Sequence, residues 1–271
     1  MTQFNAEALK RAIQTRVFGQ VVHYWDEVDS TNTALVRLSK EGAAEGTVVL
    51  ADAQTEGRGR IGKPWFSPPG VNLHLSVLLK PPINFTEARL FTLIGSLTIA
   101  DAIEAHGVKA QVKWPNDVLV NDKKIAGVLA EVQAHDGRVE QVILGMGVNL
   151  NLDRPSMDRL FGDAAPGATS LCEVLGRTVD RNAFAARLLE SLEHRYFDFL
   201  AHGKRPVLHE WRSRSFLGRR VTLREEDMHM EGVAMDLDEE GCLLVNLDDG
   251  STVRVREGEV IPLGHGPGGG E

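Results

Sequence analysis

Two short turn sequences constrain the fold most strongly, because each lies between segments rich in β-forming residues. Asn121-Asp122 separates VKWPNDVLV from KKIAGVLAEV, and Asp136-Gly137 separates that second segment from RVEQVILGMGVNLN. Two-residue turns of this composition join neighbouring antiparallel strands. The sequence therefore predicts an antiparallel meander over residues 112–151.

Helices and further strands surround this meander. Apolar residues with a period of two predict strands, and apolar residues at helical spacing between capping residues and glycines predict helices. The strands are expected at 20–28, 47–54 and 71–80, and the helices at 4–16, from Asp29, Ser30 or Thr31 to Gly42, at 86–106 and at 180–202. Residues 152–169, rich in Asp, Pro and Gly, are expected to form a long loop. The pattern is typical of an α+β fold with a mixed or antiparallel sheet and helices.

The character of the sequence changes after Arg214. Short segments of alternating apolar and polar residues follow, with tight turns at Glu240-Gly241 and Asp249-Gly250. About fifty residues of this kind are typical of a small β-barrel. We therefore expect a main domain over 1–214, a β-barrel domain over 215–264 and a disordered tail over 265–271.

Composition and charge restrict the classes of function. The chain has 271 residues, of which 42% are hydrophobic, and a net charge of −8, which argues against a general nucleic-acid or membrane-surface protein. Cys172 and Cys242 lack the spacing of a zinc site and are expected to be reduced thiols. The N-terminus lacks the apolar region of a signal peptide, and no apolar run approaches the roughly 18 residues of a membrane span. We expect a cytoplasmic protein.

A cationic loop stands out against this acidic background. Residues 57–63 read GRGRIGK, and Pro64-Trp65 follow. Glycines let the backbone approach a ligand and turn N–H groups toward an anion, and Arg and Lys supply charge. Pro64 stands where a P-loop requires Ser or Thr, which excludes that nucleotide-binding motif. These residues alone fit an anion-binding loop and a solvated surface loop about equally well.

Two other stretches gather polar side chains that suit a small ligand. KWPNDVLVNDKKIAG, residues 113–127, places an amide and a carboxylate, Asn116 and Asp117, close to two lysines. An amide pairs with a nucleobase or sugar, and a carboxylate holds a metal. A turn and a solvated hairpin tip are the alternative explanations. DSTNT, residues 29–33, gathers hydroxyls and an amide at a helix start, where capping is the alternative.

Taken together and in order, these stretches resemble the biotin protein ligases. The motifs DSTNT, AxxQTxGRGRxGKxW, KWPNDV, KKIAG and GMGVNL follow one another between residues 23 and 151, and the C-terminal segment resembles the family's SH3-like domain. The resemblance implies a class II synthetase-like catalytic domain that uses ATP to convert biotin to biotinyl-5′-AMP. The biotinyl group is then transferred to a lysine of a biotin carboxyl carrier domain of acetyl-CoA carboxylase or a related carboxylase. It also implies Mg²⁺ as cofactor and a homodimer.

The resemblance further assigns roles to individual residues. Lys124 and Arg58 are expected to be catalytic, and Lys124 is expected to bridge the biotin carboxylate and the α-phosphate. Biotin is expected to bind Ser30, Thr31, Asn32, Gln54, Arg58, Gly59, Arg60 and Lys124. ATP is expected to bind Arg58, Arg60, Lys63, Trp65, Lys113, Asn116, Asp117 and Asn149, and a metal ion to bind Asp117. Gly127 and Gly147 either allow close approach of a ligand or serve packing.

The sequence departs from the family pattern in three places. Lys63 stands where the family often has Arg, and it lacks the bidentate geometry of a guanidinium. The predicted loop 152–169 has no tryptophan to cover the adenine, so Phe161 or no residue takes that place. Only 29 residues precede Ser30, whereas three helices with turns need about 40, so a DNA-binding winged helix and repressor function are not expected. We expect neither nucleic acid nor a membrane among the partners.

Two other functions fit parts of the pattern. A lipoate or octanoate ligase shares the fold and the acyl-adenylate chemistry, but GRGRxGKxW and KWPND favour biotin. A non-catalytic biotin-binding module is expected to lose Lys124 or the loop cations, and this sequence keeps both. In a ligase, the 57–63 loop is expected to be disordered without ligand and to close over the substrates, which protects the acyl-adenylate from water.

Overall fold

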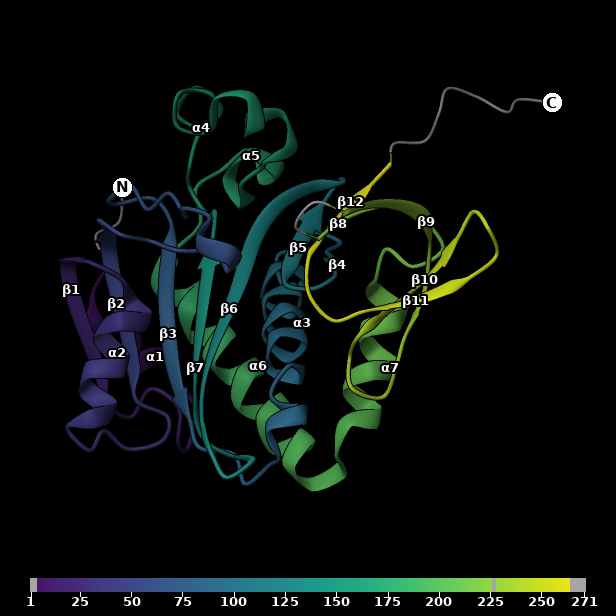
Figure 1. Ribbon diagram of the computed structural model, residues 1–271. Coiled ribbons are helices and arrows are strands. Elements are labelled where there is room, and N and C mark those ends of the chain that lie inside the picture. The colour runs from purple at the N-terminus through teal and green to yellow at the C-terminus, as the bar shows by residue number, and fades with distance from the viewer. Residues whose placement is uncertain (1–3, 226–227, 264–271) are drawn as a thin grey trace.

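A seven-stranded sheet with helices on both faces, flanked by a second, five-stranded sheet, makes up the fold (Figure 1). The computed structural model describes residues 4–225 and 228–263. The predicted tail 265–271 therefore lies outside the described residues. Within the described part, no helix is long and apolar enough to cross a membrane.

The first sheet is mixed, since β1 and β2 are parallel and all other neighbours are antiparallel. Its strand order is β1-β2-β3-β7-β6-β5-β4. The strands are β1 (Val22–Val28), β2 (Val48–Gln54), β3 (Leu73–Leu79), β4 (Gln111–Lys113), β5 (Asp117–Val120), β6 (Lys123–His135) and β7 (Arg138–Val148). The predicted meander is confirmed, and the turn residues Asn121, Asp122, Asp136 and Gly137 have the positive φ angles that tight hairpins require. The α+β prediction is confirmed as well.

The VKWPNDVLV segment forms two strands rather than one. A turn over Trp114–Asn116, with a cis peptide bond before Pro115, separates β4 from β5. A proline cannot donate to the strand ladder, so the pairing is interrupted there. The turn carries Trp114 into the interior, where its indole is fully buried.

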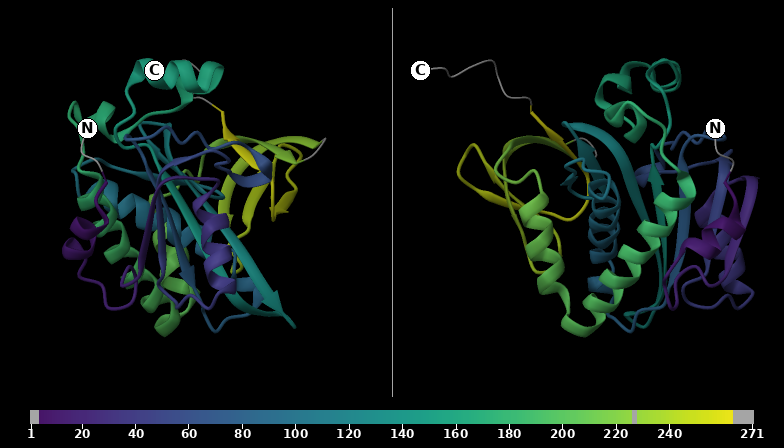
Figure 2. Two further views of the ribbon diagram at one scale, coloured as in Figure 1. Left: turned by 90° about the vertical axis from the view of Figure 1, so that its left-hand side faces the viewer. Right: turned by 180° about the vertical axis from the view of Figure 1, so that it is seen from behind.

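Helices cover the two faces of the first sheet unequally (Figures 1 and 2). On one face α2 (Thr31–Lys40) packs Ala34 and Leu35 against a small apolar cluster that includes Val49. On the other face lies the main core, covered chiefly by α3 (Leu90–Glu104) and α6 (Arg181–His202). Because α3 lies between the sheet and other helices, it is apolar on nearly every side, apart from Asp101 and Glu104 in its last turn. The remaining helices on this side are α1 (Ala6–Ala12), α7 (Lys204–Arg214) and the 3₁₀ turn η2 (Phe85–Glu87).

Several helix predictions need correction. Residues 152–169 are not a loop, because they contain α4 (Arg154–Phe161) and the 3₁₀ helix η3 (Gly162–Gly167), followed by α5 (Leu171–Leu175). Asp153 caps α4 by accepting from the Ser156 N–H, and a proline in the first turn suits a helix start. Helix α7 was not predicted, although its proline lies in the tolerated first turn. Helix α1 covers only part of the predicted 4–16.

The second sheet is antiparallel and curls beside α7 and α3 (Figure 1). Its strands, in the order β11-β10-β9-β8-β12, are β8 (Arg220–Glu225), β9 (Met228–Leu237), β10 (Leu243–Leu247), β11 (Thr252–Val255) and β12 (Glu259–Pro262). The Trp114 Nε1–H donates to the Gly241 carbonyl at 3.1 Å. Gly241 itself packs on Leu90 and Leu93 of α3. One turn of the second sheet is thus fixed to the first domain.

The Trp114 hydrogen bond leads to a stability prediction with an internal control. Trp114 and Trp211 are both fully buried, but the Trp211 Nε1 has no partner among the described residues. Trp114→Phe should therefore lower the free energy of unfolding by about 1–3 kcal/mol more than Trp211→Phe, because it leaves a buried carbonyl unpaired. Urea denaturation of the two variants measures the difference, and equal losses would contradict the role assigned to this bond.

Candidate functional site

A cavity lies on the α2 side of the first sheet, between the start of that helix, the 57–63 loop and β12. Strands β3, β6 and β7 form its floor. All the site residues predicted from the sequence line it except Asn149: they are Ser30, Thr31, Asn32, Gln54, Arg58, Gly59, Arg60, Lys63, Trp65, Lys113, Asn116, Asp117 and Lys124. Residues from four separate motifs of the sequence therefore meet in one place.

Asn149 has a different position. Its buried side chain donates to the Thr169 carbonyl at 3.1 Å and accepts from Asn72 at 3.4 Å. These contacts tie the end of β7 to the start of α5. The predicted role of Asn149 in ATP binding stays a prediction.

One row of paired residues crosses the cavity floor. Asp117, Gly127, Gly147 and His74 lie opposite one another on β5, β6, β7 and β3. The Trp65 indole lies over the two glycines. A Cβ atom at Gly147 would be 2.5 Å from the indole Cε2, and one at Gly127 would be 3.3 Å from its Cζ3. In this structure the glycines make room for the indole.

At one end, which we call the uncharged end, hydroxyls and amides line the cavity, and the Glu131 carboxylate lies behind them, where it accepts from Asn32 Nδ2 at 2.7 Å. The Thr31 N–H and hydroxyl both donate to Gln54 Oε1, at 2.8 and 3.1 Å, and Gln54 Nε2 donates to the Ser67 hydroxyl at 2.8 Å. The Ser76 Oγ lies 2.8 Å from the Thr31 Oγ1 and 2.6 Å from the Asn32 Oδ1. Ser30 occupies the N-cap position of α2, but its side chain makes no capping hydrogen bond. A capping hydrogen bond therefore does not explain why a serine occupies position 30.

The opposite end is built around the buried carboxylate of Asp117. Lys113 Nζ lies 2.9 Å from its Oδ2, and Lys124 Nζ lies 2.6 Å from its Oδ1. Burial alone would raise the pKa of Asp117, but the two ammonium groups outweigh it and lower that pKa below its ordinary value. The Lys124 Nζ also lies 5.6 Å from the centroid of the Trp65 ring, which places it between the two ends of the cavity.

Two ion pairs and a backbone hydrogen bond hold the 57–63 loop in place. The Gly59 N–H donates to the Lys63 carbonyl at 2.7 Å, and the short 3₁₀ turn η1 (Arg60–Gly62) lies between them. Arg58 pairs with Glu131 of β6 at 3.2 Å, and Lys63 pairs with Glu259 of β12 at 2.8 Å. All four side chains are more than one third exposed, and pairs of this kind contribute about 0–1 kcal/mol. An arriving anion can therefore compete for these cations.

Arg60 differs from its neighbours because it has no ion pair within residues 4–225 and 228–263. Burial lowers the pKa of its guanidinium, and the charges of Glu257 and Asp117 only partly offset this effect. A half-buried cation without a close carboxylate favours a negatively charged ligand. Together with Lys63, Lys113 and Lys124, it gives this end of the cavity four cationic side chains, whereas Arg58 pairs with Glu131, which also accepts from Asn32.

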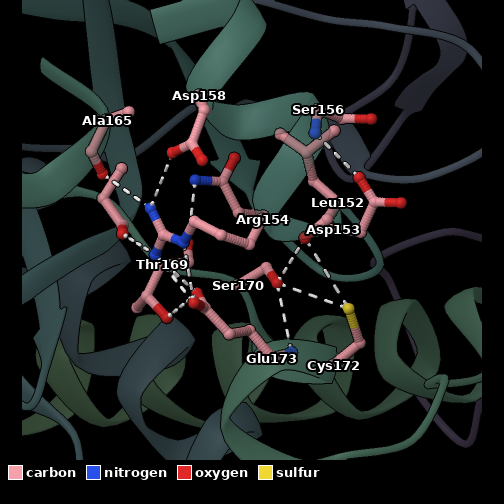
Figure 3. A network of polar contacts seen from close by, with 12 residues as sticks. Leu152, Asp153, Arg154, Ser156, Asp158, Ala165, Thr169, Ser170, Cys172 and Glu173 are labelled. Atoms are coloured by element: carbon pink, nitrogen blue, oxygen red, sulfur yellow. Dashed lines mark hydrogen bonds and ion pairs between the residues drawn. The ribbon is translucent and has the colours of Figure 1, made fainter. Parts of the chain in front are cut away.

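Helices α4 and α5 lie beyond the end of the sheet at which β7 ends (Figure 1). Arg154 holds the two helices together (Figure 3). The Arg154 guanidinium donates to the carbonyls of Ala165 and Ala168, both at 2.9 Å, and to the carboxylate of Glu173. Burial raises the pKa of Glu173, but hydrogen bonds from Thr169 and Arg154 outweigh it and lower that pKa overall. The Thr169 N–H then donates to the Lys124 carbonyl at 2.9 Å. This segment therefore supports the strand that carries Lys124.

Phe161 ends α4 and packs against the loop that follows Trp65. Its ring centroid lies 5.6 Å from that of Phe66. Phe161 is not among the residues that line the cavity as described. Its role in covering an adenine stays a prediction.

The donor set does not fit a resident Mg²⁺ ion. Both oxygens of Asp117 are engaged by lysines, and the described residues contain no group of three or more His, Cys, Asp or Glu side chains placed to hold a metal. Mg²⁺ usually binds one or two carboxylates together with substrate phosphates. The predicted metal role of Asp117 stays a prediction.

Sequence reasoning missed four residues that the structure brings to the site. Glu131 and Glu259 pair with the loop cations, and Ser76 and His74 contribute to the floor. Ser76 and His74 lie two residues apart within the otherwise apolar strand LHLSVLL. Polar side chains are uncommon in a buried strand, so these two could have indicated a functional site from the sequence. The two glutamates had no such signal, since they are paired through the tertiary structure.

Comparisons with known proteins agree on the class of protein. Residues 24–149 match the Biotin/lipoate A/B protein ligase family, and residues 216–261 match the Biotin protein ligase C terminal domain. Bifunctional ligase/repressor BirA of Bacillus spizizenii is 35% identical over 89% of this chain and 74% of its own. Biotin–[acetyl-CoA-carboxylase] ligase of Mycobacterium tuberculosis is 32% identical over 88% and 90%.

A solved structure gives the same result. Biotin protein ligase from Aquifex aeolicus in complex with biotin and ATP superimposes with a TM-score of 0.74 and 29% identity, over 89% of this chain and 97% of that one. The chain belongs to the biotin protein ligase family. The predicted fold class, including the C-terminal SH3-like domain, is confirmed.

The glycine row leads to a graded prediction. Gly147→Ala should displace the Trp65 indole, because the new methyl would lie 2.5 Å from it, whereas Gly127→Ala at 3.3 Å requires a shift of only tenths of an ångström. We expect Gly147→Ala to change the tryptophan fluorescence. We also expect it to raise the KM for the substrate at least tenfold, because a displaced indole would misplace the bound substrate. Gly127→Ala should have a much smaller effect. Equal effects of the two substitutions would argue against this packing.

The buried imidazole of His74 leads to a prediction on pH. Burial, helped by the Arg181 charge, lowers the pKa of His74 from 6.5 to about 4. As pH falls, the unfolded chain binds this proton first. The native state therefore loses stability between pH 6.5 and about 4, by on the order of 3 kcal/mol, and loses none above that range. Urea denaturation near neutral pH and near pH 5 should show a larger drop for the wild-type chain than for His74→Phe. An equal drop would show that His74 does not titrate in this way.

Proposed function

We propose that this chain activates biotin with ATP as biotinyl-5′-AMP and transfers the biotinyl group to a lysine of a carboxylase carrier domain. The observation that carries the proposal is the cavity with two unlike ends and Lys124 between them. An uncharged polar end suits a neutral ureido ring. A cationic end suits a carboxylate and a triphosphate, which would otherwise repel each other.

In the first step a carboxylate oxygen of biotin attacks the α-phosphorus of ATP, and pyrophosphate leaves. Lys124 would contact both reacting anions, and Asp117 holds its ammonium group in position at 2.6 Å. Arg58 and Arg60 would neutralise charge as the anions approach. Holding the reactants together in this geometry reduces the entropic barrier of a bimolecular step.

In the second step the neutral amine of the acceptor lysine attacks the acyl carbon, AMP leaves and the amine loses a proton. The acyl-adenylate must be kept from water until then. The 57–63 loop would serve as a lid, since its ion pairs with Glu131 and Glu259 are weak enough to be exchanged for substrate anions. The match of residues 216–261 to a biotin ligase domain supports biotin over lipoate.

Several other expectations from the sequence stay predictions. They are the Mg²⁺ requirement, the homodimer, the lack of operator-DNA binding, the cytoplasmic location and the domain limits 1–214 and 215–264. Sedimentation with and without biotin and ATP tests the dimer. Transfer of labelled biotin, rather than labelled lipoate, to a carrier domain tests the substrate, and transfer of lipoate alone would refute the choice of biotin.

Lys124 offers the sharpest test of the chemistry, because the chain supplies a matched control. Lys124→Ala should reduce biotin-dependent pyrophosphate release by about 10²–10³-fold, the usual cost of one lost group that stabilises transition-state charge. Lys123→Ala removes the neighbouring lysine, which does not line the described cavity, and should leave the rate nearly unchanged. Near-normal release by Lys124→Ala would contradict the role proposed for this residue.

A further inference from the structure

His74 is a buried, unpartnered polar side chain in the cavity floor. Its residue is 1% exposed, and neither ring nitrogen has a hydrogen-bond partner among the described residues. A buried polar group without a partner costs on the order of 1–3 kcal/mol, so it needs a functional or structural explanation. The mechanism above does not use His74.

The strand geometry places His74 at the uncharged end of the cavity. His74 and Ser76 alternate on the same face of β3, about 7 Å apart along the strand. Ser76 contacts Thr31 and Asn32, which define that end. On the row that crosses the floor, β7 and β6 separate His74 from β5, which carries Asp117, and this distance is about 14 Å at ordinary strand spacing.

At this end the amide oxygens of Gln54 and Asn32 already contact other polar groups, whereas both ring nitrogens of His74 have no partner among the described residues. Gln54 Oε1 already accepts two hydrogen bonds from Thr31. The Asn32 Oδ1 contacts Ser76, and the Asn32 Nδ2 donates to Glu131. A neutral imidazole has one donor and one acceptor nitrogen, and here both are uncommitted. Its low pKa keeps that acceptor unprotonated at neutral pH.

We propose that His74 is a specificity-determining residue whose unprotonated ring nitrogen accepts a hydrogen bond from a ureido N–H of biotin. The inference rests on the proposed function, because it takes biotin as the occupant with its carboxylate toward Lys124. A ureido ring offers two N–H donors and one carbonyl acceptor. With its carboxylate at the cationic end, its ring lies at the end that contains His74.

The test measures binding of biotin and of two derivatives, each methylated at one ureido nitrogen, by titration calorimetry. His74→Phe keeps a ring but removes both nitrogens, and it should weaken biotin binding about tenfold. For the derivative that lacks the N–H facing His74, wild type and His74→Phe should bind equally well. A hydrogen bond between His74 and the nearby Trp65 indole, or a packing role, predicts the same loss for all three ligands.

Two further variants separate the possible causes. His74→Asn keeps a donor and an acceptor and should retain most of the affinity, and thermal unfolding of each variant checks the fold. His106→Phe makes the same change at a histidine that stacks on Phe184 outside the cavity, and it should leave biotin affinity unchanged.

The outcomes are distinct. Undiminished biotin binding by His74→Phe, or an equal loss for biotin and both methylated derivatives, would overturn this inference alone. Failure of the wild-type chain to bind biotin would overturn the proposed function and this inference with it. A loss of about tenfold that disappears with one methylated derivative would support both.

Discussion

The buried carboxylate of Asp117, held between Lys113 and Lys124, is the interaction on which the site depends. A buried carboxylate without partners costs several kcal/mol, so this acid and its two lysines stabilise one another only as a set. Lys113 also donates to the Val260 carbonyl of β12 at 3.3 Å, and the Lys124 carbonyl accepts from Thr169. The two lysines that pair with this acid thus also join the C-terminal sheet and the α4–α5 segment to the cavity.

The floor of the cavity shows how a flat sheet is made into a binding site. Two paired glycines, Gly127 and Gly147, leave space that the Trp65 indole fills. A third, Gly145, leaves space for the Asn32 side chain, which a Cβ atom there would meet at 2.2 Å. Small residues on β6 and β7 thus let side chains from other segments lie directly on the backbone. These side chains divide the cavity into an uncharged end and a cationic end.

Much of the fold and the site was predictable because it depends on local sequence. Tight turns defined the meander, and the five motifs contain most of the residues that line the cavity. The errors also have local causes. The Asp, Pro and Gly content of residues 152–169 predicts a loop, whereas Asp153 and Pro155 are residues that are common at a helix start and begin α4. The short 3₁₀ and α elements after it have no apolar period to detect.

The sequence alone determined which chemical groups the site contains: hydroxyls and amides in DSTNT, cations in GRGRIGK, and an acid with lysines in KWPND and KKIAG. Only the tertiary structure decided which of them are paired. Glu131 and Glu259 engage the loop cations, Arg60 has no ion pair in the described part of the chain, and His74 is left without a partner there. The reason is physical. Strand register and domain packing set these contacts between residues as many as 196 positions apart, and local sequence carries no record of them.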